Sequence, residues 1–135
     1  MQLFSAIDHI GIAVVDIDDA VAFYRETFGV TEWELIELPE RAMRVAVAHY
    51  GDSAVELIAP TAPEAAFAKY LAEKGPGMHH IAYRVDDIVA ALATLKAQGL
   101  RLIDEQPRPG LHGTSVAFIH PKATMGTLIE LVQHP

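Results

Sequence analysis

The chain has 135 residues, of which 51% are hydrophobic and 21% are charged, and it contains no cysteine. This length corresponds to one domain with a substantial core, and the net charge of −8 disfavours nucleic acid and anionic membrane as partners, since both need a basic surface. Without cysteine there is neither a disulfide framework nor a thiolate metal site, and without a long apolar run we expect a cytoplasmic protein.

The first part of the chain predicts a β-α-β-β-β module over residues 5–60. Its opening strand, at 7–14, is mostly apolar and β-branched. Asp16 then supplies an N-cap for a helix with apolar residues at near-helical spacing, which Gly29 ends. We expect the other strands at 31–38, 43–50 and 53–58, the last two joined by a tight turn.

A linker helix is predicted over 63–74, with Pro63 in its first turn, and a second module follows over 78–133. This module repeats the order of the first, and its helix is capped by Asp86 or Asp87. We expect its strands at 79–85, 100–104, 115–120 and 127–132. The segment 106–113 is too rich in proline and glycine to be regular.

The two modules are related by an internal repeat. The same number of positions separates the members of three pairs, His9 and His80, Asp16 and Asp87, and Ala20 and Ala91. Units of this length cannot bury their apolar faces alone and must pair. We therefore predict one α+β domain, residues 1–135, in which two paired βαβββ modules form an open cup-shaped mixed β-sheet with flanking helices.

Each module opens on a strand with a histidine, His9 or His80, and closes on a strand with a glutamate, Glu56 or Glu130. Side chains alternate between the faces of a strand, so glutamates flanked by aliphatic residues point away from the helix-packed core, into the cup or into solvent. Their matched positions favour the cup. Two imidazoles and two carboxylates suit Co²⁺, Mn²⁺, Zn²⁺, Ni²⁺ or Fe²⁺ and leave octahedral positions open for water or a chelating substrate.

The chain resembles the vicinal oxygen chelate superfamily and, within it, the methylmalonyl-CoA epimerases, nearly end to end. The resemblance is carried by DHIGIAV at 8–14, VELIAP at 55–60, GMHHIAY at 77–83, GLHG at 110–113, HPK at 120–122 and GTLIEL at 126–131. It implies paired modules around a divalent metal, with ligands at His9, Glu56, His80 and Glu130. A glutamine is also found at the second of these positions in the family, which makes Glu56 the looser match.

The activity implied by the resemblance is interconversion of the (R) and (S) forms of methylmalonyl-CoA. The α-proton is removed and returned through an enolate that the metal stabilises, and Glu130 is implied to act as both ligand and catalytic base. Inversion also needs a second acid/base group. Some relatives carry a glutamate near the position of Val45, where this chain has none, so His112, a water molecule or Glu40 are the alternatives.

Other polar residues are assigned by their local context. His112, in a Gly-Pro loop, and Lys122, which together with Arg108 could hold coenzyme A phosphates, are candidate substrate contacts, with plain solvent exposure as the competing interpretation. The remaining histidines are expected in packing, in a turn or on the surface: His79, His120, His49 and His134. An acyl-CoA is the expected partner, and a homodimer is expected by resemblance.

Three other functions compete with the epimerase. Glyoxalase I can use the same four ligands, but many glyoxalases carry an Asp-Pro-Asp-Gly type of turn where this chain has His120-Pro121-Lys122. An extradiol dioxygenase would use two histidines and one glutamate around Fe²⁺, and a fourth ligand at Glu56 argues against it. A drug-sequestering relative would have no need of four metal-type residues.

Overall fold

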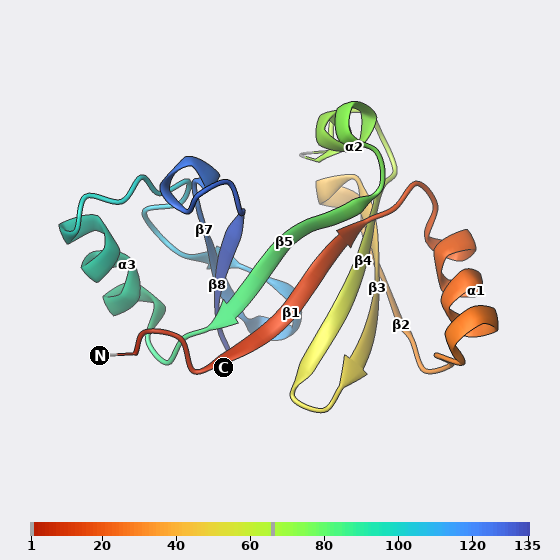
Figure 1. Cartoon of the computed structure of the whole chain (residues 1–135), viewed down its shortest axis with the longest axis horizontal. Helices are drawn as coiled ribbons and strands as arrows, with labels where there is room; N and C mark the ends of the chain where they lie inside the picture. Colours follow the sequence, from red (N-terminus) through yellow and green to blue (C-terminus); the bar gives the residue numbers. More distant parts are fainter. Residues whose placement is uncertain (1, 66) are drawn as a thin grey trace. The chain divides into compact units, whose positions relative to one another are not determined.

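The computed structural model describes residues 2–65 and 67–135, and it contains both predicted modules (Figure 1). The elements of the first are β1 (Ala6–Ala13), α1 (Ile17–Phe28), β2 (Glu34–Leu38), β3 (Met43–Tyr50) and β4 (Ser53–Pro60). After α2 (Ala68–Lys74), the second comprises β5 (Gly77–Arg84), α3 (Ile88–Ala97), β6 (Arg108–Pro109), β7 (Ser115–Ile119) and β8 (Ile129–Gln133). The predicted α+β class with two βαβββ modules is confirmed.

The chain divides into two compact units whose borders fall inside β1 and β5. One unit is Ile10–His79, with the strand order β2-β3-β4-β1 and antiparallel pairing of β3 with β2 and β4. The other unit consists of two segments, the residues up to His9 and the range His80–Pro135. Its strand order is β1-β5-β8-β7-β6. In this second unit β8 is parallel to β5 and antiparallel to β7, so the strand directions are mixed, as predicted.

Capping side chains at repeated positions define the starts of α1 and α3. Asp16 Oδ1 accepts a hydrogen bond from the backbone N–H of Asp19 at 2.9 Å, and Asp87 Oδ1 accepts one from that of Ala90 at 3.0 Å. Each bond satisfies an N–H that has no partner within the helix. Helix α1 ends at Gly29, whose φ of 71° is a left-handed conformation that glycine adopts without strain.

Each unit packs a helix against one face of its strands. In the second unit, buried residues of α3 and the strands form one cluster, which includes Ile88, Leu92, Leu95, Ala117, Ile119 and Leu131. Because Leu131 is buried beneath α3, alternation along β8 turns Glu130 to the opposite face. In the unit Ile10–His79, Leu57 of β4 packs with Ile17 and Val21 of α1, which turns Glu56 away from that helix in the same manner.

The strand predicted at 100–104 is not a regular strand. It makes an isolated bridge between Leu102 and Ile119, and the N–H groups of Ile103 and Asp104 both donate to the carbonyl of Phe118. The side chain of Asp104 also accepts the N–H of Phe118 at 2.9 Å, which removes the donor that a continuing ladder would use. The edge strand β6 instead lies at Arg108–Pro109, within the segment predicted to be irregular.

The linker helix is shorter than predicted. Helix α2 begins at Ala68, not near Pro63, because the preceding segment folds into turns in which Ala65 and Ala68 donate to the carbonyls of Ala62 and Ala65. Residues 1 and 66, which fall in the predicted domain and linker helix, lie outside the described residues. None of the helices in the described ranges is long and apolar enough to cross a membrane.

The core assignment can be tested at Leu131, which is fully buried under α3. We expect Leu131→Ala to lower the free energy of unfolding by about 2–5 kcal/mol, because it removes buried apolar contacts and leaves a cavity. Val89→Ala, on the exposed side of α3, should change it by no more than about 0.5 kcal/mol. Urea denaturation followed by circular dichroism measures both, and equal losses would contradict the assignment.

Candidate metal centre

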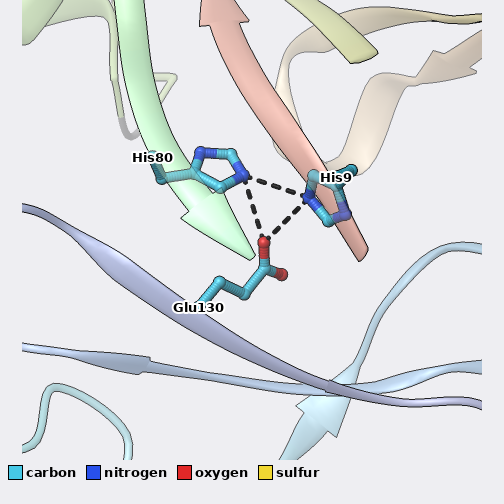
Figure 2. Close-up of side chains that lie close together, drawn as sticks. All are labelled: His9, His80 and Glu130. Atoms are coloured by element: carbon cyan, nitrogen blue, oxygen red, sulfur yellow. Dashed lines mark hydrogen bonds and ion pairs between the residues drawn. The ribbon is translucent and has the colours of Figure 1, made fainter. Parts of the chain in front are cut away.

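Three side chains predicted as metal ligands converge in the second unit (Figure 2). They are His9 of β1, His80 of β5 and Glu130 of β8. His9 Nε2 lies 3.2 Å from His80 Nε2, and Glu130 Oε1 lies 3.1 Å from each of these nitrogens. All three residues are buried, with 5%, 8% and 7% of their surface exposed in that order. The three donor atoms therefore form a nearly equilateral triangle.

The strand pattern explains why these side chains meet. Alternate positions of β1 are buried from His9 onward, and Gly11 and Ala13 share its face. In the ladder of β8, Glu130 is opposite Ala82 of β5 and opposite Phe118 of β7. Ala82 is two residues beyond His80, so it lies on the same face of β5. Its small side chain leaves the glutamate free to reach the histidine.

The charge of Glu130 is stabilised by its neighbours. Burial alone raises the pKa of this carboxyl, but hydrogen bonds with His80 and His9, and their positive charge when protonated, outweigh burial and lower the pKa to about 2. The carboxylate is therefore ionised throughout the neutral range. A buried carboxylate next to two imidazole nitrogens is an arrangement that a divalent cation would compensate well.

The donor atoms fit a cation in both kind and spacing. A transition-metal ion bonded at about 2.1 Å to adjacent donors places those donors about 3 Å apart, and the observed separations are 3.1–3.2 Å. Two imidazoles and one carboxylate suit Co²⁺, Mn²⁺, Zn²⁺, Ni²⁺ or Fe²⁺. His9, His80 and Glu130 are therefore suited to hold a divalent metal.

Glu56, the fourth predicted ligand, belongs to the other compact unit, Ile10–His79. It is half-buried on β4, opposite Val47 of β3, on the face away from α1. Its orientation within that unit agrees with the alternation argument. Its participation as a ligand stays a prediction.

The two predicted substrate contacts lie in loops of the second unit. His112 is exposed and adopts a left-handed conformation, with φ of 57°, in the short turn Leu111–Gly113. Lys122 is exposed in the turn Pro121–Ala123, and its backbone N–H donates to His120 Nδ1 at 3.1 Å. His120 therefore caps this turn, as predicted. Arg108 pairs with Asp104 and lies over the ring of Phe118.

The histidine next to the metal site has the packing role predicted for it. His79 makes edge contacts with the rings of Phe67 and Tyr70, with ring centroids 5.7 and 5.0 Å apart. It contributes to the unit Ile10–His79, whereas His80 contributes to the metal site. Alternation along β5 separates the two adjacent histidines in this way.

Sequence reasoning missed two residues beside the metal site. Asp8 hydrogen-bonds His9 Nδ1 at 2.8 Å, although alternation predicts opposite faces for adjacent strand residues. His134 is exposed, as predicted, but it also contacts the same carboxylate at 2.5 Å. Burial alone raises the pKa of Asp8, but hydrogen bonds from His9, His134 and Arg84 outweigh it and hold this pKa well below its usual range. The Asp-His dipeptide, a carboxylate next to a candidate ligand, was the available sequence signal.

Comparisons with known proteins show the family to which this chain belongs. The family described as the glyoxalase/bleomycin resistance protein/dioxygenase superfamily matches residues 8–118. Human mitochondrial methylmalonyl-CoA epimerase is 38% identical over 128 residues, which span 94% of this chain and 73% of the human protein. The crystal structure of methylmalonyl-CoA epimerase from Mycobacterium tuberculosis, 34% identical, superposes with a TM-score of 0.92 over 100% of this chain and 91% of that chain.

A solved complex and a more distant relative refine the comparison. A methylmalonyl-CoA epimerase in complex with methylmalonyl-CoA and NH4+ is 38% identical, with a TM-score of 0.88 over 98% of this chain and 95% of that chain. A probable lactoylglutathione lyase of Vibrio cholerae is 33% identical over 127 residues, 93% of this chain and 88% of that protein. The glyoxalase resemblance is thus the weaker of the two. The chain belongs to the glyoxalase/bleomycin resistance protein/dioxygenase superfamily and, within it, to the methylmalonyl-CoA epimerases.

Proposed function

We propose that this protein is a metal-dependent isomerase that interconverts the (R) and (S) forms of methylmalonyl-CoA. The observation that carries the proposal is the buried triangle of His9, His80 and Glu130 in a chain that matches such epimerases almost end to end. The three donors alone also fit the two-histidine, one-carboxylate set of an extradiol dioxygenase. The match to epimerases is therefore what decides between the two.

The reaction requires a carbon acid to lose and regain one proton. In methylmalonyl-CoA the α-proton lies between a thioester carbonyl and a carboxylate, so its loss leaves negative charge on the carbonyl oxygens. A divalent cation, when bound, acts as a Lewis acid that stabilises this charge. Burial of the three residues that would hold it keeps water away and strengthens such electrostatic effects.

Glu130 is our candidate for one acid/base group as well as for a ligand. Its carboxylate is ionised and buried, so it is available to accept a proton at neutral pH. With a pKa of about 2 it is a weak base, and the substrate must therefore be strongly acidified for the transfer to proceed. Its position on β8, next to Leu131 that α3 covers, fixes its orientation toward His9 and His80.

The second acid/base group comes from elsewhere, since Val45 is buried on β3 and carries no ionisable group. Of the alternatives, we propose His112, because it lies in the same compact unit as the metal site and an imidazole can both accept and donate a proton. Glu40, in the turn Pro39–Arg41, is exposed and belongs to the other unit.

Lys122 is proposed to bind the phosphate groups of the coenzyme A portion. It lines an open hollow together with Gly99, Leu100, Arg101 and Ala123. Burial, followed by the positive charges of Arg101 and Lys122, lowers the pKa of nearby His120, which shows that both cations act on one region. In a chain of net charge −8, such a local pair of cations suits an anionic substrate.

Two further expectations accompany this proposal. We propose that the protein works as a homodimer, by resemblance to its relatives, and that it is located in the cytoplasm. Size-exclusion chromatography with light scattering measures the first, and localisation of the tagged protein measures the second. A monomer at working concentration would contradict the dimer.

The proposed function is tested by following α-proton exchange in D₂O. We expect the Co²⁺-loaded protein to incorporate deuterium at the α-carbon of methylmalonyl-CoA and to interconvert the two forms of this substrate. It should neither consume oxygen nor act on a glutathione hemithioacetal. Glu130→Gln should lower the exchange rate by about 10²–10⁴-fold, because it removes a general base. His49→Gln, on an exposed position of β3, is the control. Oxygen uptake or turnover of the hemithioacetal in place of exchange would overturn the proposal.

The second acid/base group is tested with each enantiomer separately. In an enzyme with two acid/base groups on opposite faces of the substrate, each group removes the α-proton of one enantiomer. Removing one group therefore lowers the exchange rate of that enantiomer more than the rate of the other. We expect His112→Gln to lower exchange from one enantiomer by about 10²-fold, while Glu40→Gln leaves both rates unchanged. The opposite pattern would assign the role to Glu40, and unchanged rates in both variants would indicate a water molecule.

The role of Lys122 is tested with a full and a truncated substrate. We expect Lys122→Ala to raise KM for methylmalonyl-CoA about two- to fivefold without changing kcat, because an exposed charge pair contributes little. The pantetheine thioester lacks the nucleotide phosphates, so its KM should be the same for the variant and the wild type. A KM rise of equal size for both substrates would contradict phosphate binding.

A further inference from the structure

The carboxylate of Asp8 contacts three side chains, and its two oxygens have different partners. Oδ2 contacts His9 Nδ1 at 2.8 Å. Oδ1 accepts from Arg84, whose Nη2 lies at 3.0 Å and Nε at 3.3 Å, and it is 2.5 Å from His134 Nε2. Only 11% of the Asp8 side chain is exposed. Arg84 and His134 thus hold Oδ1 in place, while Oδ2 contacts His9.

This arrangement determines which nitrogen of His9 faces the metal site. An ionised carboxylate can only accept hydrogen bonds, so His9 Nδ1 must be the donor in the contact with Asp8. In the metal-bound state, a neutral His9 that keeps its proton on Nδ1 offers the Nε2 lone pair to the cation in place of the hydrogen bond with Glu130. Nε2 is the atom that lies 3.1 Å from Glu130 Oε1 and 3.2 Å from His80 Nε2. The contact therefore prepares His9 to bind a cation through Nε2.

Local strand geometry does not account for the contact. Asp8 and His9 are neighbours on β1, where alternation would place their side chains on opposite faces. Arg84 comes from the end of β5, and His134 follows directly on β8. The Gln133 side chain accepts the N–H of Ile88 at 2.8 Å, which ties the residue before His134 to the start of α3. Two distant segments thus hold Asp8 against His9.

We propose that Asp8 is a positioning residue for the metal centre, held by Arg84 and His134, and that it sets the tautomer and ring orientation of His9. The inference deepens the metal centre on which the proposed function rests. Carboxylates that hold a ligating histidine in this way typically raise metal affinity by about 10–100-fold. His134, predicted to be an ordinary surface residue, would in this role couple the segment after β8 to metal binding.

The first test is metal affinity, measured by titration of the full-length wild type and variants with Co²⁺ in competition with a chelator. Asp8→Asn should weaken Co²⁺ binding by about 10–100-fold. His134→Ala removes one of the groups that hold Oδ1 and should weaken it by about two- to tenfold. His49→Ala is the matched control and should leave the affinity unchanged. Equal affinity of wild type and Asp8→Asn would overturn the inference, as would failure of the wild type to bind Co²⁺.

The second test observes the tautomer directly and does not depend on the stability of any variant. In the Zn²⁺-loaded wild type, ¹H–¹⁵N correlation of the histidine rings should show His9 with a protonated Nδ1 and a metal-bound Nε2. Coordination through Nδ1 would overturn the inference. Neither test uses methylmalonyl-CoA, so a protein that binds Co²⁺ as expected but fails the exchange assay would disprove the proposed substrate while supporting the role of Asp8.

Discussion

The alternation of side chains along β8 connects the stability of this protein to its chemistry. Leu131 is fully buried against α3, and its neighbour Glu130 must then face the opposite side of the strand, where it meets His9 and His80. A shift of one residue in the pairing of β8 would place a carboxylate under the helix and a leucine at the metal site. The apolar core therefore enforces the register that the metal centre needs.

The same constraint places the buried charge of Glu130 among partners that compensate it. Two imidazole nitrogens lie 3.2 Å apart around a buried carboxylate oxygen, and burial of a charge is unfavourable unless partners compensate it. Hydrogen bonds with the histidines already lower the pKa of Glu130 to about 2. A rigid, preorganised group of this kind loses little conformational entropy when a metal binds, which favours tight and geometrically specific binding.

Features with a local or periodic cause were predictable from the sequence. The repeat predicts matching roles for His9 and His80, which meet at one site, and for Asp16 and Asp87, which both cap helices. Alternation along the strand predicts that Glu130 faces away from the helix, as it does. The contacts of Asp8 with Arg84 and His134 were not predictable, because they join distant segments and bring together neighbours that alternation separates. The segment 100–104 was mistaken for a strand because its apolar pattern carries no sign that the Asp104 side chain would take the N–H of Phe118.

The edge strand of the second unit has a consequence for association between molecules. The outermost strand of the second unit, β6, contains two residues, Arg108 and Pro109. A proline offers no N–H and a charged arginine resists close stacking, so this margin is a poor template for adding a foreign strand. The edge of the second unit is thereby protected against aggregation along this strand.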